Sequence, residues 1–313
     1  MFLRSLFLAL MVSCTGFAQS QPILLITSFE PFDIIKGPML TKEVNYSEIF
    51  ANAMVQELDQ KFRGKVRVEH VTLPVSYARA FDTLTNYIKS LPTQPNWIIS
   101  VGQSKSKYIV KTTVGGFLKK GTETETIVNR MRIETMAHNQ ISTDSYDNDD
   151  FVAASPDGSK AVPIDSSKPK SFGFNLPIQD IYCSLPPAAQ ELLLVSIDAG
   201  EYVCNQLSFK IMDAVTSGQL QSQFVFVHVP FFQNSVETEA RFIEKNVEPV
   251  NKFAIQMVKK AKRGKNANYF MPTDQTHIKS LAEANIKRKD ASEQYLCLAN
   301  FYSRMVKKET PQK

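Results

Sequence analysis

The sequence predicts an α/β fold with three layers, α/β/α, around a mixed, largely parallel central sheet, plus insertions and a C-terminal helical extension. Short aliphatic and aromatic runs typical of buried strands recur along the chain, and most lead into segments with helical apolar spacing. With 43% hydrophobic and 21% charged residues, the composition is that of a globular protein. Together these observations predict one large α/β domain over residues 21–265.

The first 18 residues have the features of an export signal. Arg4 supplies positive charge, residues 6–12 form an apolar core, and Gly-Phe-Ala at 16–18 forms a small-x-small cleavage site. Because the apolar run is too short for a stable anchor, we expect an exported, periplasmic or secreted protein with no transmembrane anchor in the mature chain. In an alternative interpretation, Cys14 is lipidated and the chain is a lipoprotein.

From residue 21 onward, strands are expected to alternate with helices. The apolar run 23–27 predicts the first strand, which ends in a loop at 28–32. The same periodicities then predict a helix at 44–58, a strand at 66–71, a helix at 77–90 and a strand at 97–101. Gly102 and Gln103 close the last of these strands.

The middle of the chain contains two expected insertions. Residues 107–132 include a Gly-Gly pair and the polar run GTETET, which predict a hairpin or an excursion near the pocket. Residues 151–171 are rich in Ser, Pro, Asp and Lys and predict a loop. Later elements are a helix through 183, a strand at 192–197, a helix from 203, a strand at 224–229 and a helix at 236–262.

Residues 266–313 are expected to form a basic helical extension. Apolar residues keep helical spacing over 278–305, and basic residues are scattered among them. Such a segment is expected to pack on the body of the protein or on another subunit, which leaves a homo-oligomer open. The net charge of +5 is too small to indicate a nucleic-acid partner.

Cys204 and His228 are candidates for a nucleophile and its base. Cys204 falls in the first turn of the helix after a Gly turn, where unpaired N–H groups and the helix dipole favour a thiolate. His228 lies near the end of a buried strand, where sites form in open α/β sheets. A lone cysteine is more often a small buried hydrophobe, and a lone histidine is more often structural.

Several segments carry a family resemblance. They are ILLITSFEPF, VNYSE, LPVSYARAFDTL, WIISVGQ, FNLPIQDI, AGEYVCN and FVHVP, which occur in this order from about residue 21 to 235. In order and content they resemble the pyroglutamyl peptidase I (pyrrolidone-carboxylate peptidase) family of cysteine peptidases, with this chain as a divergent exported member. AGEYVCN followed by FVHVP is the more specific pair.

The resemblance implies an omega-peptidase that hydrolyses the amide bond after an N-terminal pyroglutamyl residue, with pyroglutamylated peptides as substrates and no cofactor. It assigns the nucleophile to Cys204 and the base to His228. The register of the segment ETMAHN assigns to Glu134 the acid that orients the imidazole. Phe29 and Phe32 match the aromatic residues that sandwich the lactam ring.

Two more positions bear on substrate binding and turnover. Gln103 matches a turn that helps to bind the lactam through hydrogen bonds, although Ser and Lys residues replace the Gly-Gly-Arg that follows in the family. Asp144 stands where the family has an arginine close to the reaction centre, and an anion there would oppose a developing oxyanion. A nearby lysine could substitute, backbone N–H groups near Cys204 could suffice, or activity could be reduced or lost.

Two alternative functions follow from these departures. One is a catalytically impaired protein that binds a lactam or a peptide on the same scaffold. The other is a cysteine amidase with a different acyl specificity.

Cysteine number gives one more hypothesis. Without the signal, three cysteines remain, and one solution pairs Cys183 with Cys297 and leaves Cys204 as a reactive thiol. Three free thiols are the other solution. No CxxC motif or His/Cys cluster in the sequence suggests a metal site.

Overall fold

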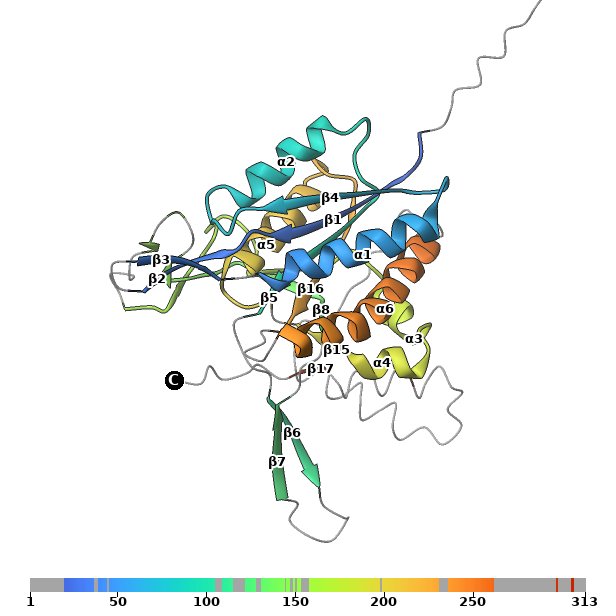
Figure 1. Ribbon diagram of the computed structural model, residues 1–313. Helices are drawn as coiled ribbons and strands as arrows, with labels where there is room; N and C mark the ends of the chain where they lie inside the picture. The colour runs from blue at the N-terminus through green and yellow to red at the C-terminus, as the bar shows by residue number, and fades with distance from the viewer. Residues whose placement is uncertain are drawn as a thin grey trace, which may run out of the picture.

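The computed structural model of the protein (Figure 1) describes most of the chain between residues 20 and 261. The expected signal at 1–18, with Cys14, lies outside the described residues, as do Asp144 and nearly all of the expected extension at 266–313. No helix among the described residues is long and apolar enough to cross a membrane. The described residues are 20–36, 39–43, 45–104, 109–114, 122–127, 131–143, 145–146, 149, 151–152, 158–197, 199–230, 236–261, 297 and 305–306.

A seven-stranded sheet forms the middle layer, in the order β17-β15-β8-β16-β5-β1-β4. Its strands are β1 (Ile23–Phe29), β4 (Arg67–Leu73), β5 (Trp97–Gln103), β8 (Met131–Glu134), β15 (Leu193–Ser196), β16 (Gln223–Val229) and the two-residue β17 (Met305–Val306). Neighbouring strands run parallel, except that β8 is antiparallel to β16. The sheet is therefore mixed and largely parallel, as the sequence predicts.

Helices cover both faces of the sheet (Figure 1). On one face, α1 (Tyr46–Phe62) packs on β1, β4 and β5, and α6 (Val236–Ala261) packs on α1. The short helices α3 (Ile178–Cys183) and α4 (Pro187–Leu192) pack on α6. On the other face lie α2 (Ala80–Ser90) and α5 (Val203–Thr216), which contact each other. This arrangement confirms the predicted three layers.

Among the elements that the sequence did not predict are the central strand β8 and the helix α4. Met131 and Arg132 were assigned to the first insertion, but they belong to the central strand β8, which is four residues long and contains two charged residues. The helix α4 was missed because Pro186 and Pro187 suggest a loop. Proline is compatible with the first turn of a helix, where its missing N–H would have no partner.

The first insertion contains the predicted hairpin. Strands β6 (Ile109–Val114) and β7 (Thr122–Ile127) pair antiparallel, and Figure 1 shows them extending away from the central sheet. Another hairpin pairs β2 (Phe32–Lys36) with β3 (Met39–Glu43). Between β8 and α3 the chain forms short antiparallel pairs, which join β9 (Met136–His138) to β14 (Ser171–Gly173), β10 (Ile141–Ser142) to β13 (Ala161–Val162) and β11 (Ser145–Tyr146) to β12 (Phe151–Val152).

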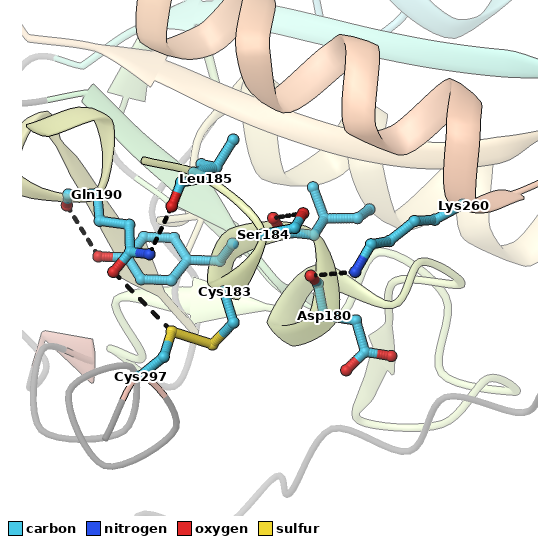
Figure 2. Close-up of a disulfide and its surroundings, with 9 residues drawn as sticks. Asp180, Cys183, Ser184, Leu185, Gln190, Lys260 and Cys297 are labelled. Atoms are coloured by element: carbon cyan, nitrogen blue, oxygen red, sulfur yellow. Dashed lines mark hydrogen bonds between the residues drawn. A yellow bond between two sulfur atoms is a disulfide. The ribbon is translucent and has the colours of Figure 1, made fainter. Parts of the chain in front are cut away.

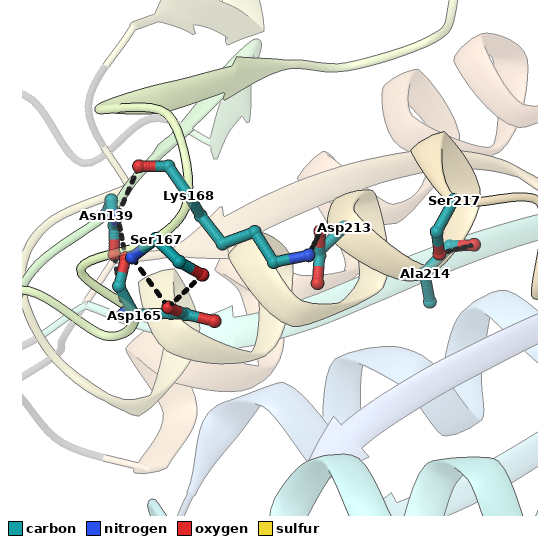
Figure 3. Close-up of polar contacts among 7 residues, drawn as sticks. All are labelled: Asn139, Asp165, Ser167, Lys168, Asp213, Ala214 and Ser217. Carbon is teal, nitrogen blue, oxygen red and sulfur yellow. Dashed lines mark hydrogen bonds and ion pairs between the residues drawn. The ribbon is translucent and has the colours of Figure 1, made fainter.

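The end of the second insertion is fastened to α5 (Figure 3). Lys168 Nζ lies 2.8 Å from Asp213 Oδ1 on α5, and this ion pair raises the pKa of Lys168. The backbone N–H of Asp165 donates to Asn139 Oδ1 at 3.0 Å, and Ser167 donates to the Asp165 carboxylate. The predicted loop is therefore held against the helix that carries Cys204.

A disulfide joins Cys183, at the end of α3, to Cys297, with the two Cα atoms 5.6 Å apart (Figure 2). The hypothesis that these two residues pair is confirmed, and Cys204 is not part of a disulfide. Further along the chain, Met305 and Val306 pair with Val195 and Ser196 at the edge of the sheet. The C-terminal segment is thus attached to the body at two points.

Candidate active site

Cys204 is the second residue of α5 and comes directly after a tight turn. Gly200 has φ +84°, a conformation that L-residues rarely adopt, so the turn between β15 and α5 requires glycine. Val203, Leu207 and Ile211 are buried along the inner face of α5, as their spacing predicts. This packing fixes the first turn, where helical N–H groups lack intrahelical partners and the dipole favours an anion. Cys204 is itself buried, with 8% of its surface exposed.

The sulfur of Cys204 rests on the sheet at Gly102. A Cβ atom on Gly102 would lie 2.8 Å from Cys204 Sγ and 2.5 Å from Phe226 Cζ. Any side chain at this position would therefore displace both the sulfur and the phenyl ring. In the sheet, Gly102 on β5 pairs with His228 on β16. The thiol and the imidazole thus come from neighbouring positions at one end of the sheet.

His228 is hydrogen-bonded to Glu134 on the next strand. His228 Nδ1 lies 2.7 Å from Glu134 Oε1, and both side chains are buried. An ionised carboxylate only accepts hydrogen bonds, so Nδ1 carries the hydrogen and Nε2 becomes the proton acceptor. The ring of Phe226 packs against the imidazole, with centroids 4.8 Å apart. This environment fixes both the orientation and the tautomer of His228.

Glu134 stays ionised although it is fully buried. Burial by itself would raise the pKa of Glu134, but the charge of Arg132 and the hydrogen bond and charge of His228 outweigh it, so the pKa lies below its usual value. Arg132 Nε is 3.4 Å from Glu134 Oε1, the oxygen that also contacts His228. The carboxylate therefore sits between a permanent cation and the imidazole.

A small pocket opens beside Cys204. Its lining residues are Phe29, Phe32, Asn45, Val75, Gln103, Tyr202, Val203 and Cys204. Phe29 is the last residue of β1 and Phe32 the first of β2, so neither aromatic residue lies in the predicted loop. The pocket brings the three predicted substrate-binding residues together with the predicted nucleophile.

Hydrogen bonds at the start of α1 organise the polar side of this pocket. The backbone N–H of Tyr46 donates to Gln103 Oε1 at 2.7 Å, which leaves the Gln103 amide hydrogens as the donors of that side chain. Asn45 caps α1 by accepting from the Ser47 N–H, and it donates to the carbonyl of Glu30. Because the Phe29 N–H donates to Ser47 Oγ, the aromatic wall is tied to the same cap.

Asn205 connects the Glu134 segment to the start of α5. Its amide group donates to the carbonyls of His138 and Gln140 and accepts from the His138 N–H, at 2.7–2.8 Å. Asn205 is completely buried, whereas His138 and Gln140 are partly exposed, so these bonds are shielded from water on the Asn205 side. The sequence contains Asn205 only as the last letter of the AGEYVCN motif, and its role was missed.

The site therefore contains two connected parts. Cys204, Phe29, Phe32 and Gln103 line one pocket, and Glu134 and His228 form a buried pair next to Gly102. A thiol beside an oriented imidazole suits acyl transfer. Within the described ranges, no three His, Cys, Asp or Glu side chains form a group that could hold a metal ion.

Known proteins of one family are similar to this chain. A model of the family described as pyroglutamyl peptidase matches residues 126–260. The pyrrolidone-carboxylate peptidase of Thermococcus onnurineus is 24% identical over 217 residues, which cover 69% of this chain and 88% of the relative.

Solved structures agree at the level of the fold. The pyrrolidone carboxyl peptidase of Thermococcus litoralis has 21% identity and a TM-score of 0.55, and the match covers 80% of this chain and all of that one. Pyroglutamyl peptidase I of Bacillus amyloliquefaciens has 20% identity and a TM-score of 0.52, with 77% and 98% of the two chains covered.

Proposed function

Since this chain belongs to the pyroglutamyl peptidase family as a distant member, we propose that it is a cysteine peptidase that removes an N-terminal pyroglutamyl residue from peptides. The observation that carries the proposal is the buried hydrogen bond of 2.7 Å between His228 and Glu134, one strand away from the glycine on which Cys204 rests. A buried, oriented imidazole next to a thiol is the arrangement that cysteine hydrolases need.

The pocket supports the choice of substrate. A pyroglutamyl group is a flat, neutral lactam, and the aromatic walls provided by Phe29 and Phe32 suit such a ring. Gln103 Oε1 already accepts the Tyr46 N–H, so the amide hydrogens of Gln103 are available to donate to the lactam carbonyl.

The proposed reaction has two halves. The Cys204 thiol gives its proton to His228 Nε2, and the thiolate attacks the carbonyl carbon of the pyroglutamyl group. When the tetrahedral intermediate collapses, the C–N bond breaks, His228 protonates the leaving amine, and a thioester remains. A water molecule then loses a proton to His228 and attacks the thioester, which releases pyroglutamate and restores the thiol.

Two groups stabilise charge during these steps. Glu134 stabilises the His228 imidazolium each time the ring holds the extra proton. The first-turn N–H groups of α5 are the natural donors to the oxyanion, because the helix dipole points the same way. In our proposal these N–H groups stabilise the oxyanion, although this chain has Asp144 where the family has an arginine.

The test is hydrolysis of pyroglutamyl-aminomethylcoumarin in the presence of a thiol reductant. We expect wild-type protein to release the fluorophore, and Cys204→Ala to release none while it keeps the same melting temperature. Glutamyl- and prolyl-aminomethylcoumarin are the matched control substrates, because they lack the lactam or its carbonyl. Folded wild-type protein that binds pyroglutamate without turnover would support the impaired binding protein, and preference for another acyl group would support the amidase.

We also propose that the chain is exported. The disulfide between Cys183 and Cys297 supports this, because disulfides form and persist in oxidising compartments. The amino-terminal sequence of the protein isolated from its native cell, determined by mass spectrometry, tests the proposal. A mature chain that begins near residue 19 is expected, and an intact Met1 in a reducing compartment would contradict it.

A further inference from the structure

Arg132 lies inside the site, although the reaction described above does not use it. Its side chain is 10% exposed, and its Nε lies 3.4 Å from Glu134 Oε1. The same oxygen accepts the hydrogen bond of His228 Nδ1. In the sheet, Arg132 pairs directly with His228, because β8 runs antiparallel to β16. A permanent cation thus contacts the carboxylate at the point where the imidazole is bound.

The reactivity of Cys204 depends on whether the Nδ1 proton stays on His228 or moves to Glu134. When the Cys204 thiol transfers its proton to His228, the ring becomes an imidazolium that shares its Nδ1 proton with Glu134. A fully buried carboxylate resists ionisation, so without another cation that proton would tend to move onto Glu134. The imidazolium would then be neutralised, and the thiolate would lose its nearest positive partner.

We propose that Arg132 is a positioning residue that acts through Glu134: it keeps this carboxylate ionised and oriented toward His228, and thereby favours the thiolate of Cys204. The inference rests on the proposed roles of Cys204 and His228. It adds a fourth side chain to Cys204, His228 and Glu134, and it explains why an arginine is buried in a central strand. Its effect on the thiol is indirect, which distinguishes it from a residue that contacts the substrate.

Other ionisable groups on the elements packed here are more distant or already engaged. The described strands β5 and β15 carry none. Further along α5, Lys210 follows Cys204 by six residues, and Asp213 is paired with Lys168. On β9, the ring of His138 is hydrogen-bonded to the carbonyl of Ile197. Arg132 is therefore the cation that the described structure places in contact with Glu134.

The experiment measures the thiol itself and needs no substrate. The rate of Cys204 alkylation by iodoacetamide is followed from pH 4 to pH 10 under non-reducing conditions, and the label is located by mass spectrometry. Arg132→Gln should raise the pH midpoint of Cys204 alkylation by about one unit. At a pH below the midpoint, the variant should then contain about tenfold less thiolate than wild type. Arg132→Lys, which keeps the charge, should stay within about half a unit of wild type.

A double-mutant cycle separates an effect through Glu134 from a direct one. In the Glu134→Gln background, Arg132→Gln should shift the midpoint by less than about 0.3 unit, because there is no carboxylate at position 134 for Arg132 to keep ionised. An unchanged midpoint in folded Arg132→Gln, or an equal shift in both backgrounds, would overturn the inference. If Arg132→Gln does not fold, the same cycle is measured with Arg132→Met, which also removes the charge, and the same midpoints support or overturn the inference.

These outcomes do not depend on the proposed substrate. A chain that alkylates as expected but does not release pyroglutamate would lose the proposed function and keep the role of Arg132. A chain that hydrolyses the pyroglutamyl substrate with no change in alkylation on substitution of Arg132 would keep the function and lose the inference.

Discussion

Gly102 and Cys204 are in such close contact that the sulfur occupies the space where a side chain on Gly102 would begin. A Cβ atom there would stand 2.8 Å from Cys204 Sγ, closer than carbon and sulfur approach in folded proteins. Gly102 is at the same time the sheet partner of His228. Because Gly102 has no side chain, the Cys204 thiol on α5 can approach the His228 imidazole on β16.

Replacement of Gly102 by alanine should damage the site as well as the core. The new methyl group would also meet Phe226 Cζ at 2.5 Å, so the phenyl ring and the sulfur must both move. Overpacking of this kind typically costs about 1–3 kcal/mol of unfolding free energy. Urea denaturation and the rate of Cys204 alkylation measure the two effects. Gly173→Ala is the matched control, since a Cβ there meets nothing within 4 Å; equal behaviour of the two variants would contradict the prediction.

Removal of the Asn205 amide should weaken the attachment of α5 to the segment that follows Glu134, which includes His138 and Gln140. Asn205→Ala removes the acceptor of the His138 N–H and the donor to the Gln140 carbonyl, while the His138 carbonyl still accepts from the Gln140 N–H. We expect a loss of about 2–4 kcal/mol of unfolding free energy, because buried polar groups without partners are costly. Asn139→Ala is the control, because its bonds to Asp165 are exposed and only its longer bond to the Lys168 carbonyl, at 3.2 Å, is partly buried; it should lose less than about 1 kcal/mol. Similar losses in both variants would show that Asn205 has no special role.

The sequence is most informative where a single element carries its own pattern. Cys204 and His228 follow directly from a strand–turn–helix pattern and from a dense apolar strand, and both lie where those patterns place them. Glu134 has no such local pattern, because a carboxylate in a short strand with an arginine two positions earlier looks like a surface segment. It was assigned through the family register alone.

Features that depend on contacts between distant segments could not be predicted. The roles of Gly102 and Arg132 depend on which strands are neighbours, and strand order does not follow from periodicity. The antiparallel β8 reverses the usual direction within the sheet, so Arg132 faces His228 only because of that reversal. The disulfide was a hypothesis from cysteine number, and the geometry of α3 and residue 297 decided it.

His70 should make the stability of the protein depend on pH near neutrality. Burial lowers the pKa of His70, only partly opposed by the charge of Glu48, and its Nε2 lies 2.9 Å from the buried Ser28 Oγ. The unfolded chain therefore binds a proton near pH 6.5 while the folded chain does not, so the unfolding free energy falls as the pH drops below about 6.5 toward the lowered pKa.

Urea unfolding of wild type and His70→Gln between pH 5 and pH 8 measures this dependence. The wild-type unfolding free energy should rise with pH across this window, and the variant should give a flatter curve because its amide does not titrate. Parallel curves for the two proteins would show that His70 does not contribute.

The Cys183–Cys297 disulfide should contribute to stability and, more weakly, to activity. It closes a loop with a sequence separation of 114 residues, for which the loss of chain entropy in the unfolded state predicts a stabilisation of about 4–5 kcal/mol. Because Cys297 and β17 attach the C-terminal segment, reduction also weakens the support of β15, which pairs with β17. The Ser196 carbonyl on β15 accepts from the N–H of Thr135, next to Glu134, so a small loss of activity should accompany the loss of stability.

Thermal unfolding with and without a phosphine reductant, compared with the double variant Cys183→Ser/Cys297→Ser, tests this expectation. Reduced wild type and the variant should melt at the same lower temperature, and reductant should leave the melting temperature of the variant unchanged. Cys204→Ala serves as the control, because it keeps the disulfide and should respond to reductant as wild type does. If reduction does not shift the wild-type melting temperature, the disulfide does not stabilise the fold. Any gain of activity on reduction must then come from Cys204 alone.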